Sequence, residues 1–236
     1  TIDSYCESWL DFNEKGDPVD ENGNVLEETD NPYYEAFVRD NFDIFESWIR
    51  NFREIGVRPW LSFRMNDIHG VAENNKPMLT KFWLEHPEAY RIHHHVPDGY
   101  YARTLDYEQR QVRDLMYAYI KESLERYDVD GIELDFMREM FCFAPGREFL
   151  CRELMTDFVR SIRALCDEFE QKRGHRIMTG IKLFSLPHQV FDAGFDYFTY
   201  AKERLIDVFV TGPRWETIDN DIPVEIWKEI FAPYGV

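Results

Sequence analysis

Cysteine, positive charge and long apolar runs are all scarce in this sequence of 236 residues. The four cysteines, Cys6, Cys142, Cys151 and Cys166, are too few for a disulfide framework at this length, so we expect buried thiols. Lysine and arginine number 27 against 45 acidic residues. The net charge of −18 argues against nucleic acid or an anionic membrane as a partner, because phosphate groups select clustered basic side chains. No apolar run approaches the length of a membrane span, so none is expected.

The residues that are present indicate a globular α/β protein. The length and the hydrophobic content of 44% allow one domain with a full core. Helical and strand patterns alternate along the chain, which is typical of an α/β fold. Apolar stripes of helical period occupy 44–55, 112–124, 150–169 and 224–231, and strand patterns occupy 57–65, 132–136, 176–184 and 205–210. Residues 1–10 have the character of the end of a fifth strand.

The most informative stretch is the strand pattern in the middle of the chain. Ile132, Leu134 and Phe136 alternate with Glu133 and Asp135, which is the period of two expected for a strand. Two carboxylates therefore share one face, and ionised groups are seldom buried without a partner or a task. We expect a parallel strand of an α/β barrel, with the apolar residues under the helices and the two acids pointing into the barrel near its mouth.

About five strands are recognisable, whereas a closed barrel needs eight. An open parallel sheet and the middle of a barrel both fit this number. Both ends of the chain have a truncated character, which favours the barrel. We therefore expect one TIM (β/α)8-type barrel domain over residues 1–236, incomplete at both ends.

The run Tyr127 to Ile132, followed by Asp135 and Arg138, resembles the strand motif of glycosyl-hydrolase-like (β/α)8 barrels, a group that contains bacterial cell-wall and polysaccharide-acting hydrolases. The resemblance implies a glycoside hydrolase with a polysaccharide or oligosaccharide substrate and no cofactor. It favours a secreted or cell-envelope location, although the sequence fixes neither the compartment nor the oligomeric state. Similar residues also occur at Gly56 to Trp60, His86-Pro87-Glu88, Val112-Arg113-Asp114 and Leu205-Ile206-Asp207.

Family 18 chitinases offer a second comparison. Their strand motif aligns with Asp130, Gly131, Glu133 and Asp135, but Met137 stands where those enzymes carry the catalytic glutamate. This difference argues against substrate-assisted chitinase chemistry.

Glycoside hydrolysis usually needs two carboxyl groups, one to protonate the leaving oxygen and one to attack the anomeric carbon or activate water. Asp135 is the predicted catalytic carboxylate because it lies nearest the mouth, and Glu133, one layer deeper, acts on it by like-charge repulsion. Arg138 is the expected counter-charge. A buried ion pair of Asp135 with Arg138 or Lys182 is the structural alternative.

The second catalytic acid must come from another strand end. Glu216 is the first candidate, and an exposed loop acid is an equally good interpretation of it. Asp67 and Glu139 are the others. Side chains at strand ends and in the long connection 66–105 are expected to contact the substrate: Arg138, Asp67, His69, Arg64, Trp60, Lys182, Arg214 and Trp215.

Two further functions remain open. A carbohydrate-binding barrel without catalysis would use Asp135 to hold sugar hydroxyls. A metal-dependent hydrolase would use Asp67, His69 and His93. We expect no metal, because His93, His94 and His95 are consecutive and their side chains would diverge from an extended segment.

Overall fold

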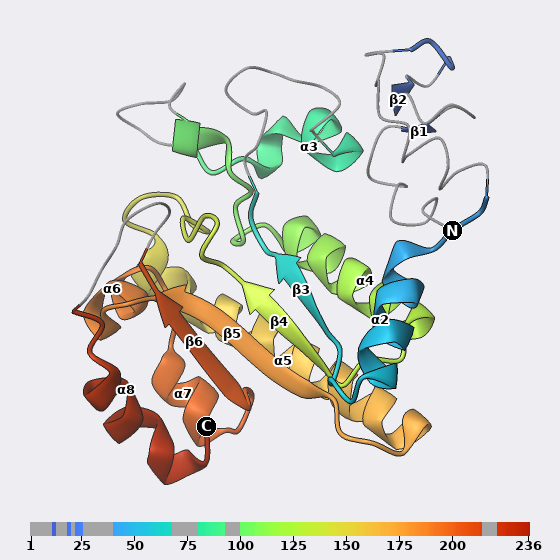
Figure 1. Cartoon of the computed structure of the whole chain (residues 1–236). Coiled ribbons are helices and arrows are strands. Elements are labelled where there is room, and N and C mark those ends of the chain that lie inside the picture. The colour runs from blue at the N-terminus through green and yellow to red at the C-terminus, as the bar shows by residue number, and fades with distance from the viewer. Residues whose placement is uncertain are drawn as a thin grey trace.

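A computed structural model describes residues 11–12, 18–19, 22–25, 40–67, 80–92, 100–213 and 221–236. Its centre is a parallel sheet with the strand order β3-β4-β5-β6 (Figure 1). These strands are β3 (Trp60–Arg64), β4 (Gly131–Asp135), β5 (Met178–Phe184) and β6 (Val208–Gly212). A separate antiparallel pair joins β1 (Asp11–Phe12) to β2 (Pro18–Val19).

Helices separate the strands of the parallel sheet. They are α2 (Ile44–Glu54), α3 (Lys81–Glu85), α4 (Arg110–Arg126), α5 (Glu148–Arg173), α6 (Pro187–Asp192), α7 (Tyr197–Lys202) and α8 (Val224–Phe231), with short 3-10 turns at Pro87–Ala89, Tyr100–Arg103 and Ala232–Tyr234. The expected α/β alternation is therefore confirmed. No helix in the described part of the chain combines the length and apolar character that a membrane span needs.

Local signals explain where several helices begin and end. The Asp43 carboxylate accepts hydrogen bonds from the N–H groups of Phe45 and Glu46 and so caps α2. Gly174 ends α5 with a φ of 78°, a left-handed conformation that glycine adopts without a Cβ clash. Asp106 and Gln109 have the spacing of a capping box, but the box is not formed. The Asp106 side chain accepts from the N–H of Glu108 instead, so α4 begins only at Arg110.

One face of the sheet is packed under helices and forms the core. Ile132, Leu134 and Phe136 are fully buried there, together with Ile181 and Leu183 of β5. Figure 1 shows α4 and α5 behind the sheet, where they cover this face. The predicted burial of the three apolar residues of β4 is confirmed.

No described helix covers the opposite face of the sheet, which carries the charged side chains. Ser62 and Arg64 of β3 are exposed, and Glu133 and Asp135 of β4 are half-buried. We call this surface the open face. Neither β3 nor β6 pairs with a further strand among the described residues, so the sheet has four strands there. Cys142, Cys151 and Cys166 are buried free thiols, as expected, and Cys6 lies outside the described residues.

Candidate functional site at the carboxyl edge of the sheet

The strand register arranges the open face in rows. Arg64 of β3 pairs with Asp135 of β4, Asp135 with Lys182 of β5, and Lys182 with Val210 of β6. Arg64 and Asp135 are the last residues of their strands, so this row lies at the carboxyl edge of the sheet. Ligands of parallel α/β folds bind beyond the carboxyl ends of the strands. The sequence therefore places its predicted acid at the edge where a ligand site is expected.

The carboxylate of Asp135 is held at both oxygens. Its Oδ2 lies 3.2 Å from Lys182 Nζ, and its Oδ1 accepts a hydrogen bond of 2.8 Å from the N–H of Met137. The Asp135 side chain is 15% exposed, and that of Lys182 is 36% exposed. The acid is thus oriented by a cation and a backbone donor, while part of it remains accessible from the open face.

Glu133 lies one row deeper on the same face. Its Oε2 accepts a hydrogen bond of 2.6 Å from the hydroxyl of Ser62 on β3, a partner that the sequence did not reveal. Gly180 of β5 stands beside it in the register. Two residues along a strand correspond to about 6.6 Å, so the two carboxylates of β4 occupy neighbouring rows, as the alternation predicted.

A third carboxylate, Asp67, follows β3. Its Oδ2 lies 2.8 Å from Arg64 Nη1, and its Oδ1 lies 4.0 Å from Arg138 Nε. The expected ion pair between Arg138 and Asp135 is not formed. Arg138 lies near Asp67 instead, and Lys182 is the cation that contacts Asp135. The ion pair of Asp135 with Lys182, which was the structural alternative, is therefore present.

Trp60 lies at the other end of the same face. It is the first residue of β3 and pairs with Gly131, four residues before the row of Asp135. Four residues span about 13 Å along a strand. A Cβ at Gly131 would approach the Trp60 ring to 2.3 Å, and one at Gly180 to 3.1 Å, so the indole lies against both glycines. Trp60 therefore lies away from the row of Asp135, and its contact with a substrate stays a prediction.

The remaining predicted residues are placed as follows. Glu139, an alternative second acid, is fully buried. Glu216, His69, Arg214 and Trp215 lie outside the described residues, and so does His93. Among the described residues no group of three or more His, Cys, Asp or Glu side chains is arranged to hold a metal ion.

A pocket of about 800 Å³ lies further along the carboxyl edge. Phe184 and Gly212, the last residues of β5 and β6, line it together with the segment 140–143 after β4. Its polar residues include Ser185, His188 and Asp192. The sequence analysis did not identify these residues. The available signal was Ser185-Leu186-Pro187, where a strand ends and proline starts a helix, since such junctions line ligand sites in α/β folds.

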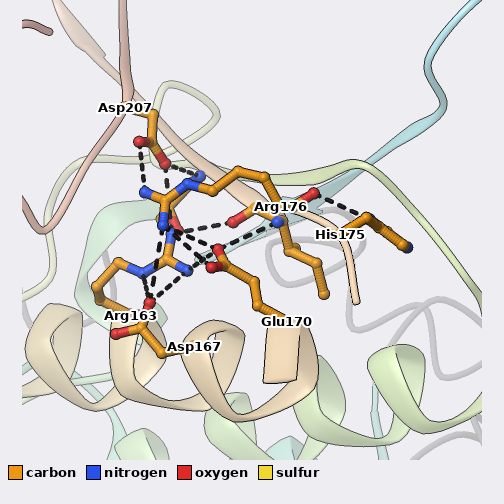
Figure 2. A network of polar contacts seen from close by, with 8 residues as sticks. Arg163, Asp167, Glu170, His175, Arg176 and Asp207 are labelled. Carbon is orange, nitrogen blue, oxygen red and sulfur yellow. Dashed lines mark hydrogen bonds and ion pairs between the residues drawn. The ribbon is translucent and has the colours of Figure 1, made fainter. Parts of the chain in front are cut away.

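The amino edge of the sheet carries a different charged cluster (Figure 2). Arg163 of α5 lies 2.6 Å from Glu170 and 3.3 Å from Asp207, and its side chain is only 7% exposed. Asp207 also accepts hydrogen bonds from Arg176 at 2.7 Å and from the N–H of Thr179 at 2.8 Å. Each charge in this cluster meets several partners, so it ties α5 to the starts of β5 and β6.

No family model matches the chain, and no curated protein is significantly similar to it. The class that the fold defines is an α/β protein with a parallel sheet. The function must be argued from the site itself.

Proposed function

We propose that this protein is a glycoside hydrolase that cleaves a polysaccharide or oligosaccharide, with Asp135 as its catalytic carboxylate. The observation that carries the proposal is the position of this side chain. It ends β4 at the carboxyl edge, faces the open face and is oriented by Lys182 while remaining partly accessible. Catalytic residues of (β/α)8 enzymes come from the carboxyl ends of the strands.

We further propose that the sheet belongs to a closed (β/α)8 barrel. Parallel sheets are normally buried on both faces, yet in the described residues helices cover only one face of this sheet. The open face places Ser62 beside Glu133 and Lys182 beside Asp135, so its polar side chains satisfy one another as they do inside a barrel. Trp60 fills the amino end of this face across Gly131 and Gly180. These contacts support the proposal that the open face is the interior surface of a barrel.

The chemistry assigned to Asp135 is attack on the anomeric carbon or activation of water. Hydrolysis with retention needs a second carboxyl group at about 5–5.5 Å, and inversion needs one at about 6.5–9.5 Å. The Cα atoms of Glu133 and Asp135 lie about 6.6 Å apart along the strand, so distance does not exclude Glu133 as the second carboxyl group, but Glu133 lies deeper in the sheet. Glu216 follows β6 in the sequence and remains the proposed acid that protonates the leaving oxygen.

The substitution Asp135→Asn tests the proposal. We expect it to abolish glycoside hydrolysis, measured with a broad panel of oligosaccharides, and to leave glycan binding in place, because the amide keeps the size and the hydrogen-bonding position of the acid. Asp157→Asn is the matched control, since it changes the same residue type on the exposed side of α5. If the unmodified protein binds a glycan but cleaves none in the panel, the hydrolase assignment is wrong.

A carbohydrate-binding barrel without catalysis is the second candidate. One observation favours it: both oxygens of Asp135 already have hydrogen-bond partners. Buried Met137 also occupies the position where related barrels carry an acid. For this function Asp135→Asn lowers glycan affinity, and no hydrolysis is detected in any variant.

A further inference from the structure

The pocket beyond β5 and β6 has an apolar wall and a polar rim. Met140, Phe143 and Phe184 contribute to the wall, and α6 contributes His188 and Asp192 to the rim. Its volume of about 800 Å³ is within the range of small-molecule sites, about 300–1,000 Å³. The register places Phe184 one row beyond Lys182, so the pocket continues the row of Asp135 outward along the carboxyl edge.

Three polar side chains of the pocket can meet a ligand. His188 and Asp192 are four residues apart on α6, share one side of that helix and are exposed to solvent. The hydroxyl of Ser185 is buried, the residue is only 5% exposed, and no described group bonds to the hydroxyl. A buried hydroxyl without a partner costs free energy unless a ligand or water satisfies it.

The charge of the lining is one-sided. Glu148 and Asp192 are acids, and none of the described residues that line the pocket is lysine or arginine. Arg91 lies behind the wall: its guanidinium is 5.1 Å from the ring centre of Phe141, it donates to the carbonyl oxygen of Phe143, and the residue is 5% exposed. Asp192 is exposed at the rim, so its carboxylate is accessible to a ligand.

Neither nucleophile in the pocket is activated. Ser185, His188 and Asp192 are the residue types of a catalytic triad, but no hydrogen bond joins them. Burial raises the pKa of the Cys142 thiol far above its ordinary value, so this cysteine stays protonated. The pocket therefore offers contacts to a ligand but no activated nucleophile.

We infer that this pocket binds a sugar unit that carries a protonated amino group. The apolar wall accepts the flat face of a pyranose ring, and the hydroxyls of the sugar meet Ser185 and His188. The ammonium group is attracted by Asp192 and by the aromatic faces of the wall, whereas a uronate, sulfate or phosphate group is repelled. This inference deepens the proposed function and rests on it for the sugar, but the preference for an amine rests on the pocket alone.

Binding measurements on the full chain test the inference. The Asp135→Asn protein, in which turnover is blocked, is titrated by calorimetry with oligomers of equal length made of glucosamine, N-acetylglucosamine, glucose and a uronic acid. We expect the glucosamine oligomer to bind most tightly and the uronic acid oligomer most weakly. Adding Asp192→Asn should weaken glucosamine binding by about threefold, the scale of an exposed ion pair, and leave glucose binding unchanged. Higher salt should reduce the loss of glucosamine binding that Asp192→Asn causes, because salt screens the attraction between the charges.

Asp157→Asn in the same background is the control, because it removes one negative charge from an exposed site on α5, where Asp157 pairs with Arg160. The inference is overturned if glucosamine binds no more tightly than glucose, if no oligomer binds, or if Asp157→Asn weakens glucosamine binding as much as Asp192→Asn. An amine preference in a protein that hydrolyses no glycoside supports the pocket assignment and contradicts the hydrolase. Hydrolysis without an amine preference supports the hydrolase and contradicts the pocket assignment.

Discussion

Charged side chains at the two edges of the parallel sheet differ in burial and in the number of their partners. At the amino edge, Arg163 is almost buried, and Glu170 and Asp207 each meet a second arginine, Arg176 (Figure 2). At the carboxyl edge, Asp135 has a single cationic partner, Lys182, which is partly exposed. In parallel α/β folds the amino edge serves stability and the carboxyl edge serves ligands. The cations differ in burial as this division predicts: Arg163 is 7% exposed and Lys182 is 36% exposed.

Energetics explain why the difference matters. Removing one member of a buried ion pair leaves its partner charged in a poor solvent, which costs about 3–5 kcal/mol. An exposed pair contributes only about 0–1 kcal/mol. The amino edge, whose cation Arg163 is buried, therefore resists substitution, whereas the loss of the partly exposed Lys182 at the carboxyl edge should cost less folding free energy.

The largest expected effect is at the amino edge. Arg163→Ala should lower the free energy of unfolding by about 3–5 kcal/mol, because Glu170 and Asp207 lose a buried donor and Thr179 Oγ1 loses its hydrogen bond from Nη1. Denaturant unfolding followed by circular dichroism measures the change.

Arg160→Ala is the matched control for Arg163→Ala. It lies on the same helix and contacts Glu153, Asp157 and Glu203, but its pairs are at the surface. We expect a loss of no more than about 1 kcal/mol. Equal losses for the two variants would remove the distinction between a buried and an exposed network.

A smaller effect is expected at the carboxyl edge. Lys182→Met should change the free energy of unfolding by about 0–1 kcal/mol, since methionine keeps most of the chain length and Asp135 retains its bond from the N–H of Met137. The same variant should impair hydrolysis, because Asp135 loses the ammonium group that orients it. A loss near that of Arg163→Ala, with activity unchanged, would assign Asp135 and Lys182 a structural role.

The smallest effect concerns pH at the amino edge. The Asp128 carboxylate, 2.6 Å from His175 Nε2, raises the pKa of His175 above its ordinary value. Because the native state favours the protonated form, the stabilisation is complete below about pH 6.5, the unfolded pKa, and is lost as the pH rises through the higher native pKa. The pair is largely exposed, so the loss should be under about 1 kcal/mol.

Unfolding measured below and above this interval tests the pH effect. His175→Gln should abolish the pH dependence that the wild type shows there. His188→Gln should preserve it, because His188 follows the carboxyl end of β5, at the opposite edge of the sheet from Asp128. A pH dependence that survives in His175→Gln would assign it to another group.

The local structure was largely predictable from the sequence. The alternation in Ile132, Leu134 and Phe136 predicted the buried face of β4, and the apolar stripe at 150–169 predicted helix α5. Both signals are local, because they depend on residues within one element. Pairing partners were less predictable: Arg138 was expected at Asp135, but the register brings Lys182 there from a strand more than 40 residues away.

The pocket and the amino-edge cluster could not be predicted for a similar reason. Both combine residues from segments that lie far apart in the chain, such as Arg163 and Asp207, and single positions carried no unusual pattern. Trp60 was expected within the strand pattern 57–65, and only the pairing with Gly131 shows that it begins β3, away from the row of Asp135.

The packing of Trp60 against Gly131 and Gly180 also constrains how this sequence can diverge. A methyl group at Gly131 would collide with the indole, and one at Gly180 would require the indole to shift by a few tenths of an ångström, so both positions favour glycine while the tryptophan is present. Replacing the tryptophan with a small residue would release both glycines at once. Three positions that are far apart in the chain are therefore expected to covary during evolution as a single unit.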